Sequence, residues 1–156
     1  MSIQTTYTGM EAGFAGQIAN IIPYVTVSKV SEGGYGFGLA VVRGTADNQA
    51  KLPSATGQDF QGVSVYTLGA YAQSDDVSAY GDEEVSTVLK KGFIWVITEE
   101  AVVPGDDVFF RHTAGAGGTV IGSFRSSADT ATADQITGAT FESTAGAGEI
   151  ALIYIS

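Results

Sequence analysis

The stretch VSTVLKKGFIWVITEEAVVPGDDVFFR, residues 85–111, has the highest density of β-branched and aromatic residues in the chain. In its first segment, Val85–Lys90, the side chains of Val85, Thr87 and Leu89 alternate with those of Ser86, Val88 and Lys90. This alternation predicts a half-buried strand. Lys91 and Gly92 then predict a tight reversal, because glycine accepts the positive φ that such a turn needs. The next segment, Phe93–Ile97, has no polar residue, so we expect a second strand that is covered on both faces.

Pro104 and Gly105 fit the two central positions of a type II turn, where proline presets φ and glycine takes a positive φ. Asp107–His112 then forms the returning strand. The whole stretch therefore predicts a three-stranded antiparallel meander at the centre of a β domain. Trp95, the only tryptophan, is expected to lie in the main core, because its strand is apolar on both faces.

Length and composition indicate one domain with few charges. The chain has 156 residues, of which 15% are charged and 21 are glycine. Typical soluble domains are about 25% charged and about 7% glycine. Such a chain has less polar surface than usual and is expected to cover part of it with partner chains, as a homo-oligomer.

The net charge is −10, and residues 75–156 hold thirteen of the seventeen acids. This acidity argues against binding nucleic acid or an anionic membrane, because both need lysine and arginine to neutralise phosphates. The chain has no cysteine, which excludes disulfides and thiolate metal sites. The N-terminus has no signal-peptide pattern, so we expect synthesis in the cytoplasm of whatever cell makes the protein.

The rest of the chain has short strand patterns separated by turn residues and almost no helical periodicity. Residues 1–16 predict an extended N-terminal arm, and residues 17–156 a single β domain. Residues 45–61 and 69–81 read as connections, and residues 126–138 as a loop or one helical turn. The expected fold is all-β, a compact antiparallel β-sandwich or barrel of roughly eight strands. The strand patterns outside the central stretch are residues 18–30, 39–42, 63–67, 120–124, 139–142 and 150–155.

No catalytic or cofactor-binding constellation is predicted. His112, the only histidine, is expected to be an exposed residue at a strand end and not the base of a Ser-His-Asp relay. The acids near Gly81 and Gly105 supply oxygen ligands that suit calcium, but their spacing does not match a calcium loop. We therefore expect a solvated acidic rim and no metal site. These acids are Asp75, Asp76, Asp82, Glu83, Glu84, Asp106 and Asp107.

Five segments, taken in order, resemble the structural cement proteins of tailed phages, also called capsid decoration proteins. The segments are GFAGQIAN (13–20), AVVRGTADNQAKLP (40–53), FQGVSVYT (60–67), VSTVLKKGFIWVITEEAVVPGDDVFF (85–110) and ITGATFESTAGAGEIALIYI (136–155). The chain departs from the family at Glu99 and Glu100, where small residues are commoner. The resemblance implies a non-enzymatic protein that binds the outside of an assembled capsid, through the major capsid protein, as dimers or trimers, and stiffens it. It also implies synthesis in the cytoplasm of a host bacterium and a final place on the exterior of the virion.

A second hypothesis is a ligand-binding β-sandwich such as a carbohydrate-binding module. It requires aromatic rings that lie coplanar on one exposed face. The candidate rings are Tyr35, Phe37, Tyr66, Tyr71 and Tyr80. An enzyme is the least favoured class, because the chain has one histidine and no cysteine.

The expected capsid or oligomer contacts are apolar side chains in the arm and in the loop GGYGFG (33–38). These segments are too rich in glycine to build a core of their own, and such side chains often mark contact patches. The alternative is that they pack onto their own fold. The predicted residues are Tyr7, Phe14, Ile18, Tyr35 and Phe37.

Overall fold

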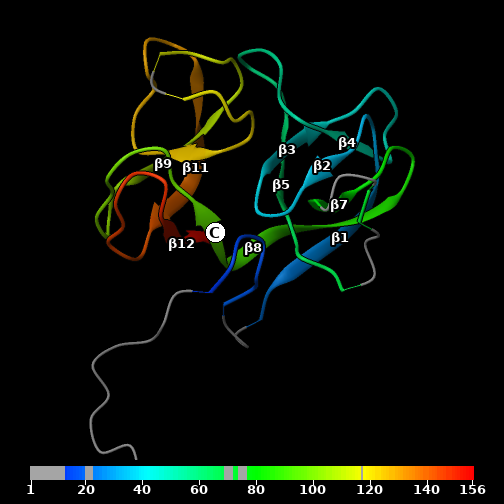
Figure 1. Ribbon diagram of the computed structural model, residues 1–156, viewed down its shortest axis with the longest axis horizontal. Helices are drawn as coiled ribbons and strands as arrows, with labels where there is room; N and C mark the ends of the chain where they lie inside the picture. Colours follow the sequence, from blue (N-terminus) through cyan, green and yellow to red (C-terminus); the bar gives the residue numbers. More distant parts are fainter. Residues whose placement is uncertain (1–12, 20–22, 69–71, 74–76, 117) are drawn as a thin grey trace, which may run out of the picture.

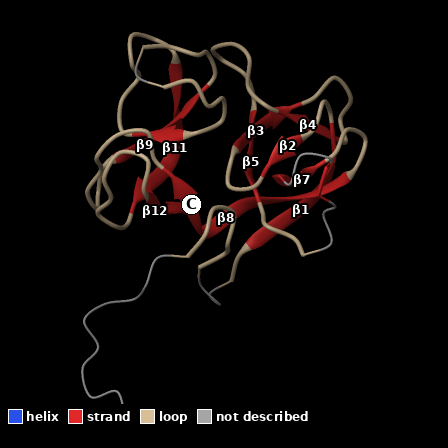
Figure 2. Cartoon of the chain, in the orientation of Figure 1, coloured by secondary structure: helices blue, strands red, loops and turns tan. Residues whose placement is uncertain are grey.

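The computed structural model describes residues 13–19, 23–68, 72–73, 77–116 and 118–156, and all regular elements in these ranges are strands (Figure 2). The predicted all-β class is confirmed. The parts that are described include no helix long and apolar enough to cross a membrane. The strands are β1 (Val25–Ser31), β2 (Tyr35–Gly36), β3 (Ala40–Arg43), β4 (Gln49–Lys51), β5 (Phe60–Ser64), β6 (Ala72–Gln73), β7 (Val77–Tyr80), β8 (Val85–Ile97), β9 (Asp107–Arg111), β10 (Phe124–Arg125), β11 (Ala133–Phe141) and β12 (Ile150–Ile155).

One long strand, β8, belongs to both halves of the molecule (Figure 1). Its first part pairs with β1 and β5, and its last six residues pair with β12. The predicted reversal at Lys91 and Gly92 is therefore wrong. Gly92 does take a positive φ, 129°. The pairing with β1 shifts register there, since Val25 faces Lys91 and Thr26 faces Leu89, so the glycine serves a β-bulge within a continuous strand.

The predicted meander is also wrong, although its second turn is right. Gly105 has φ 94°, and the amide of Asp106 donates to the carbonyl of Val103 at 3.2 Å, as expected for the type II turn. The returning strand β9 pairs with β10 and β11 and not with β8. The turn reverses the chain, but the partners that β9 reaches come from much later in the sequence.

The strands form a closed barrel with further strands outside it. The order β1-β4-β3-β5-β8 closes on itself, because β8 also pairs with β1. From β8 the sheet continues through β12, β11, β9 and β10, and a bridge between Thr98 and Phe124 brings its far edge back to the end of β8. A small sheet of β2, β7 and β6 completes the fold. Strands β4 and β7, and the start of β11, lie in segments predicted as connections.

Two apolar clusters hold these layers together. The larger one joins residues of β3, β5 and β8 to residues of β9, β11 and β12, so it lies between the barrel and the outer strands. The smaller one collects Val27, Val41, Ala50 and Val88 from four barrel strands, which identifies it with the barrel interior. Burial of this surface from water is the main stabilising contribution to such a fold.

Trp95 is buried, as predicted, with 7% of its surface exposed, but it is not part of the main core. Ile94 and Val96 point into the larger cluster, so Trp95 points to the opposite face of β8. There the segment at Gly13 covers it: a Cβ at Gly13 would lie 2.5 Å from Cδ1 of the indole ring. The amide of Gly16 also donates to the carbonyl of Trp95 at 2.8 Å.

We expect Gly92→Ala to lower the free energy of unfolding by about 2–4 kcal/mol, because it adds a steric clash to an unfavourable φ. A Cβ at Gly92 would lie 2.9 Å from the Cβ of Tyr24. Gly33→Ala is the matched control, since Gly33 has φ 83° but a Cβ there meets no atom within 4 Å. The Gly33→Ala variant therefore measures only the cost of placing alanine at a positive φ, about 1–2 kcal/mol. Urea denaturation of the two variants measures the difference, and equal losses would contradict the bulge argument.

Candidate contact surface

The aromatic residues of the loop 33–38 pack against aromatic residues from later strands and loops. Phe37 lies edge-on to Tyr66, at a centroid distance of 4.9 Å, and to Tyr80, at 5.2 Å. Tyr35 also meets Tyr80 edge-on, at 5.8 Å. Phe14 adds a further edge contact to Tyr66, at 4.6 Å. These edge-to-face pairs hold the loop and the segment at residue 14 on the same side of the barrel.

The predicted contact residues differ in how much surface they present. Phe14 is 49% exposed. Ile18 is partly buried, packs against the larger core cluster and bridges to Ile94. Tyr35 is only 4% exposed and its hydroxyl lies 2.5 Å from Oγ of Ser86. Tyr7 lies outside the described residues.

The aromatic cluster does not form the flat platform that a carbohydrate-binding module needs. The rings of Tyr35 and Tyr80 are buried, at 4% and 3% exposure. The four aromatic pairs have interplanar angles between 68° and 84°, so neighbouring rings cannot stack together on one sugar face. Tyr71 lies outside the described residues. The geometry of the other four rings argues against the second hypothesis.

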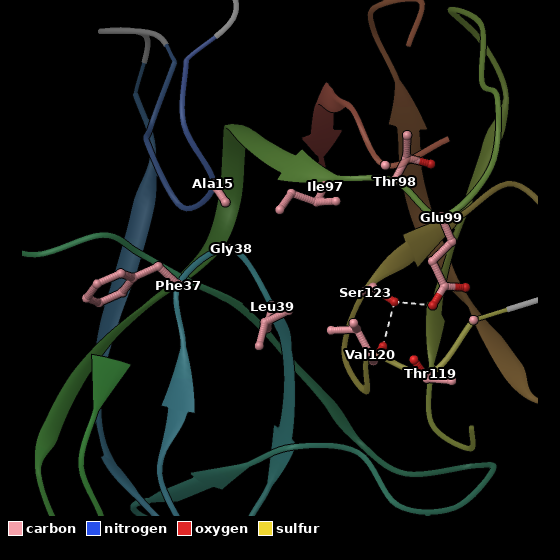
Figure 3. A pocket seen from close by; sticks show the side chains of 12 residues that line it. Ala15, Phe37, Gly38, Leu39, Ile97, Thr98, Glu99, Thr119, Val120 and Ser123 are labelled. Carbon is pink, nitrogen blue, oxygen red and sulfur yellow. Dashed lines mark hydrogen bonds between the residues drawn. The ribbon is translucent and has the colours of Figure 1, made fainter. Parts of the chain in front are cut away.

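A groove of about 320 Å³ lies beside this cluster, between the barrel and the outer strands (Figure 3). Ala15 and Phe37 bring the first segment and the aromatic loop to one side of it, while Ile97 and Val120 come from the end of β8 and the loop before β10. Ile97 is 46% and Val120 56% exposed. The remaining lining residues are Gly38, Leu39, Thr98, Glu99, Gly118, Thr119, Ser123 and Gly148.

The groove and Phe14 together form an exposed apolar surface, which we call the contact surface. It is defined by Phe14, Phe37, Leu39, Ile97 and Val120. Sequence reasoning identified the two phenylalanines but missed the three aliphatic residues. Ile97 and Val120 lie 23 positions apart, Ile97 in a strand expected to be covered on both faces and Val120 in a short predicted strand, so only the fold shows that they share an exposed face.

Behind the groove lies a buried network of charged side chains. The Nε of Arg111 donates to Oε1 of Glu99 at 2.7 Å, and its Nη2 donates to Oδ2 of Asp129 at 2.7 Å. Arg125 reaches Glu99 at 3.3 Å and Asp129 at 3.1 Å. The side chain of Arg111 is fully buried, and those of Arg125 and Glu99 are 6% and 8% exposed. Glu100 extends the network, since its Oε2 accepts from Nη2 of Arg125 at 3.1 Å.

The network fixes both the groove and the loop before β11. Glu99 also accepts a hydrogen bond from the hydroxyl of Ser123, which is drawn in Figure 3. Asp129, Thr130 and Ala131 have φ of 42°, 57° and 62°. Such a left-handed run is costly for residues other than glycine, and the hydrogen bond from Arg111 to Asp129 holds one end of it in place.

The prediction that His112 is exposed at a strand end is wrong. The residue is 4% exposed. Its Nδ1 lies 2.9 Å from Oγ1 of Thr113, and its Nε2 is 3.6 Å from Oδ1 of Asp134 and has no hydrogen-bond partner.

Some of the acids near Gly81 and Gly105, which were expected to form a solvated rim, accept local hydrogen bonds. Asp82 accepts from the amide of Gly33 at 2.7 Å, and Asp106 accepts from the amide of Val103 at 3.0 Å. Asp75 and Asp76 lie outside the described residues. Within the described ranges, no three histidine, cysteine or acidic residues lie close enough to hold a metal ion.

Two carboxylates of the network have shifted pKa values. The hydrogen bond from Arg111 holds the pKa of Asp129 below its ordinary value, against the opposing effect of desolvation. Burial raises the pKa of Glu100, but hydrogen bonds from Ser126 and Ser127 and the charge of Arg125 outweigh it, so the net shift is downward. Both carboxylates are therefore stabilised in their charged form.

We expect acid to destabilise the protein partly through Asp129. Because its pKa is lowered on folding, its contribution is complete above the unfolded pKa of about 4 and is lost as the pH falls through the folded pKa. Urea denaturation between about pH 5 and pH 2 measures this loss. Asp129→Asn is expected to reduce the dependence on pH, whereas the control Asp107→Asn, which removes an exposed carboxylate, keeps it. A variant of Asp129 with the wild-type dependence would contradict the assignment.

Comparisons with known proteins agree with this architecture. Residues 3–156 match the family model described as "Structural cement protein (E217 gp24/Pam3 gp6)". The fold is similar to a chain in "The capsid of Myoviridae Phage XM1", with a TM-score of 0.76 and 15% identity over 99% of this chain and 97% of that chain. A chain of the head fiber gp8.5 N base of bacteriophage phi29 has a TM-score of 0.44 and 13% identity, over 86% of this chain and 95% of that chain. No curated protein sequence matches the chain.

Proposed function

Because this chain belongs to the phage structural cement protein family, we propose that it stabilises its capsid by binding the outer surface of the assembled shell. The match over residues 3–156 is the observation that carries this proposal. The structural role also places the protein in the virion. Binding to the exterior, through the major capsid protein, is the finer part of the proposal.

The contact surface supports the proposed binding. Phe14, Ile97 and Val120 expose 46–56% of their surface in one region of the molecule, and apolar side chains that gather in this way often mark a protein interface. The described end of the arm, residues 13–16, adjoins the surface, since Ala15 lines the groove. Tyr7 and Phe37 belong to the proposed contact, whereas Ile18 and Tyr35 hold the surface in place from inside the fold.

Low charge and the apolar strand β12 favour a homodimer or homotrimer as the binding unit. A symmetric oligomer presents several copies of the contact surface at once, which raises the overall affinity without new contacts. The proposal includes no cofactor, no metal ion and no enzymatic activity. It also includes no nucleic acid and no membrane as partners, in line with the net charge of −10.

The first test compares capsids of the phage that encodes this protein, prepared without it, before and after addition of the purified protein. We expect the protein to cosediment with the capsids and to raise their melting temperature. If the capsids bind the protein but melt at an unchanged temperature, the proposed stabilising role is contradicted. A protein that stays in the supernatant would remove capsid binding.

The second test locates the contact. Val120→Ser is expected to weaken capsid binding about fivefold or more, since apolar anchors dominate most interfaces. Val103→Ser is the matched control, because Val103 is 52% exposed but does not line the groove. Deletion of residues 1–12 tests the arm without removing the segment that covers Trp95. Equal affinities of the two serine variants for capsids would show that the capsid contact lies elsewhere on the protein.

A further inference from the structure

The described cations are almost all engaged with a partner, and the exceptions are adjacent. Arg111 and Arg125 belong to the buried network. Arg43 pairs with Asp59, Lys51 pairs with Glu32, and the ammonium of Lys29 donates to the carbonyl of Asp47. Lys90 and Lys91 are exposed, and no acid or hydrogen-bond acceptor contacts either ammonium group within the described ranges. Among the residues that the structure describes, the two positive charges without a partner therefore lie side by side in the middle of β8.

Lys91 borders a second groove, of about 340 Å³, and Lys90 directly precedes Lys91 on β8. Its lining includes Pro23, Lys91 and Gly92. Phe93 and Tyr154 line it as well and pack against each other with a centroid distance of 4.7 Å. The bulge at Gly92 shapes this site, because the glycine leaves room for Tyr24 to lie directly over the strand.

The wall of the groove is apolar and open to solvent. Its lining residues Phe93 and Tyr154 are half-buried, and Tyr24 and Val25, which follow Pro23 in the chain, are each 49% exposed. Phe93 lies four positions before Ile97 of the contact surface on β8, and the covered Trp95 separates them. The second groove is therefore distinct from the first one, although both lie along the same strand.

We propose that this second groove binds an apolar side chain of a capsid subunit that is flanked by an aspartate or glutamate. The aromatic and proline walls fit the apolar side chain, and Lys90 and Lys91 fit the carboxylate. This inference rests on the proposed function and adds a second point of attachment. A protein that holds two neighbouring subunits through two different surfaces resists their separation, because both contacts must break.

A second copy of the chain related by a two-fold axis fits the groove less well. In a two-fold symmetric contact the same patch meets itself, so the lysines of one copy would face the lysines of the other. Like charges placed together across an interface are unfavourable. Charge complementarity therefore selects an acidic partner surface.

Carbodiimide cross-linking tests the partner directly, because the reagent joins a lysine amine to a carboxylate that is already in contact with it. The experiment uses full-length protein bound to capsids of its own phage. We expect cross-linked peptides that connect Lys90 or Lys91 to an acidic residue of the capsid subunit. Cross-links from these lysines to another copy of the same chain, found equally without capsids, would overturn the proposal in favour of a self-interface.

Affinity measurements provide the second readout. The double variant Lys90→Gln, Lys91→Gln is expected to bind capsids about tenfold more weakly at low salt and to lose most of the salt dependence of binding. The double variant Lys29→Gln, Lys51→Gln removes the same charge elsewhere and is expected to bind within about twofold of wild type. Equal effects of the two variants would overturn the inference while leaving the proposed function intact. Failure of the wild-type protein to bind capsids would overturn both.

Discussion

Arg111→Met is expected to lower the free energy of unfolding by about 3–5 kcal/mol, because removing one partner of a buried ion pair leaves the others without compensation. The Arg111 side chain is fully buried and contacts Glu99 and Asp129 at 2.7 Å. Methionine keeps much of the volume of the side chain but none of its donors. Glu99 would then be left with only Arg125 as a counter-charge.

Arg43→Met is the matched control, with the same substitution at an exposed ion pair. Arg43 has a side chain that is 50% exposed and lies 2.8 Å from Asp59, and exposed pairs contribute about 0–1 kcal/mol. Chemical denaturation of both variants gives the comparison. Similar stabilities would show that burial of the network has no energetic consequence, which would contradict the argument from desolvation.

Trp95→Ala is expected to cost a similar amount, about 3–5 kcal/mol, the usual range for truncation of a large buried aromatic side chain. The loss has a particular origin here. The indole ring lies beneath the segment that begins at Gly13, so its removal opens a cavity under that segment rather than in the main core. The native protein is expected to show blue-shifted tryptophan emission, because its only tryptophan is shielded from water.

Ile97→Ala is the control on the same face of β8. Ile97 is 46% exposed, so its truncation is expected to cost about 1 kcal/mol or less. Thermal or urea unfolding followed by circular dichroism suits both variants, since it does not depend on the tryptophan. Red-shifted native emission from the wild-type protein would contradict the burial of Trp95.

The strand pattern of the sequence predicts the fold class but not the strand pairing. Alternation in Val85–Lys90 and the apolar run Phe93–Ile97 both correspond to strand, yet they form one strand instead of two. A glycine with positive φ serves a turn or a bulge equally well. Which of the two occurs depends on the segment that pairs with it, because Tyr24, directly before β1, packs over Gly92. That contact joins residues 68 positions apart and leaves no local signal.

The contact surface and the ion network were predictable only in part. Phe14 and Phe37 stand out because they lie in glycine-rich segments. Glu99 and Glu100 were expected in a turn that tolerates charge, whereas the structure buries Glu99 between two arginines. A signal was available, since the chain has only seven cations, and Arg111 lies within a predicted strand while Arg125 directly follows one. Their pairing with Glu99, 12 and 26 positions away, is set by the closure of the outer strands.

The continuity of β8 determines how the molecule carries a mechanical load. Its first part is hydrogen-bonded to β1 and β5, and its last six residues are bonded to β12. A force that pulls the two halves apart along this strand acts perpendicular to those hydrogen bonds and loads them all at once in shear. A hairpin with its turn at Gly92 would instead lose its inter-strand hydrogen bonds one after another. Because a bulge stands where a reversal was expected, β8 is a continuous strand that transmits force between the two halves.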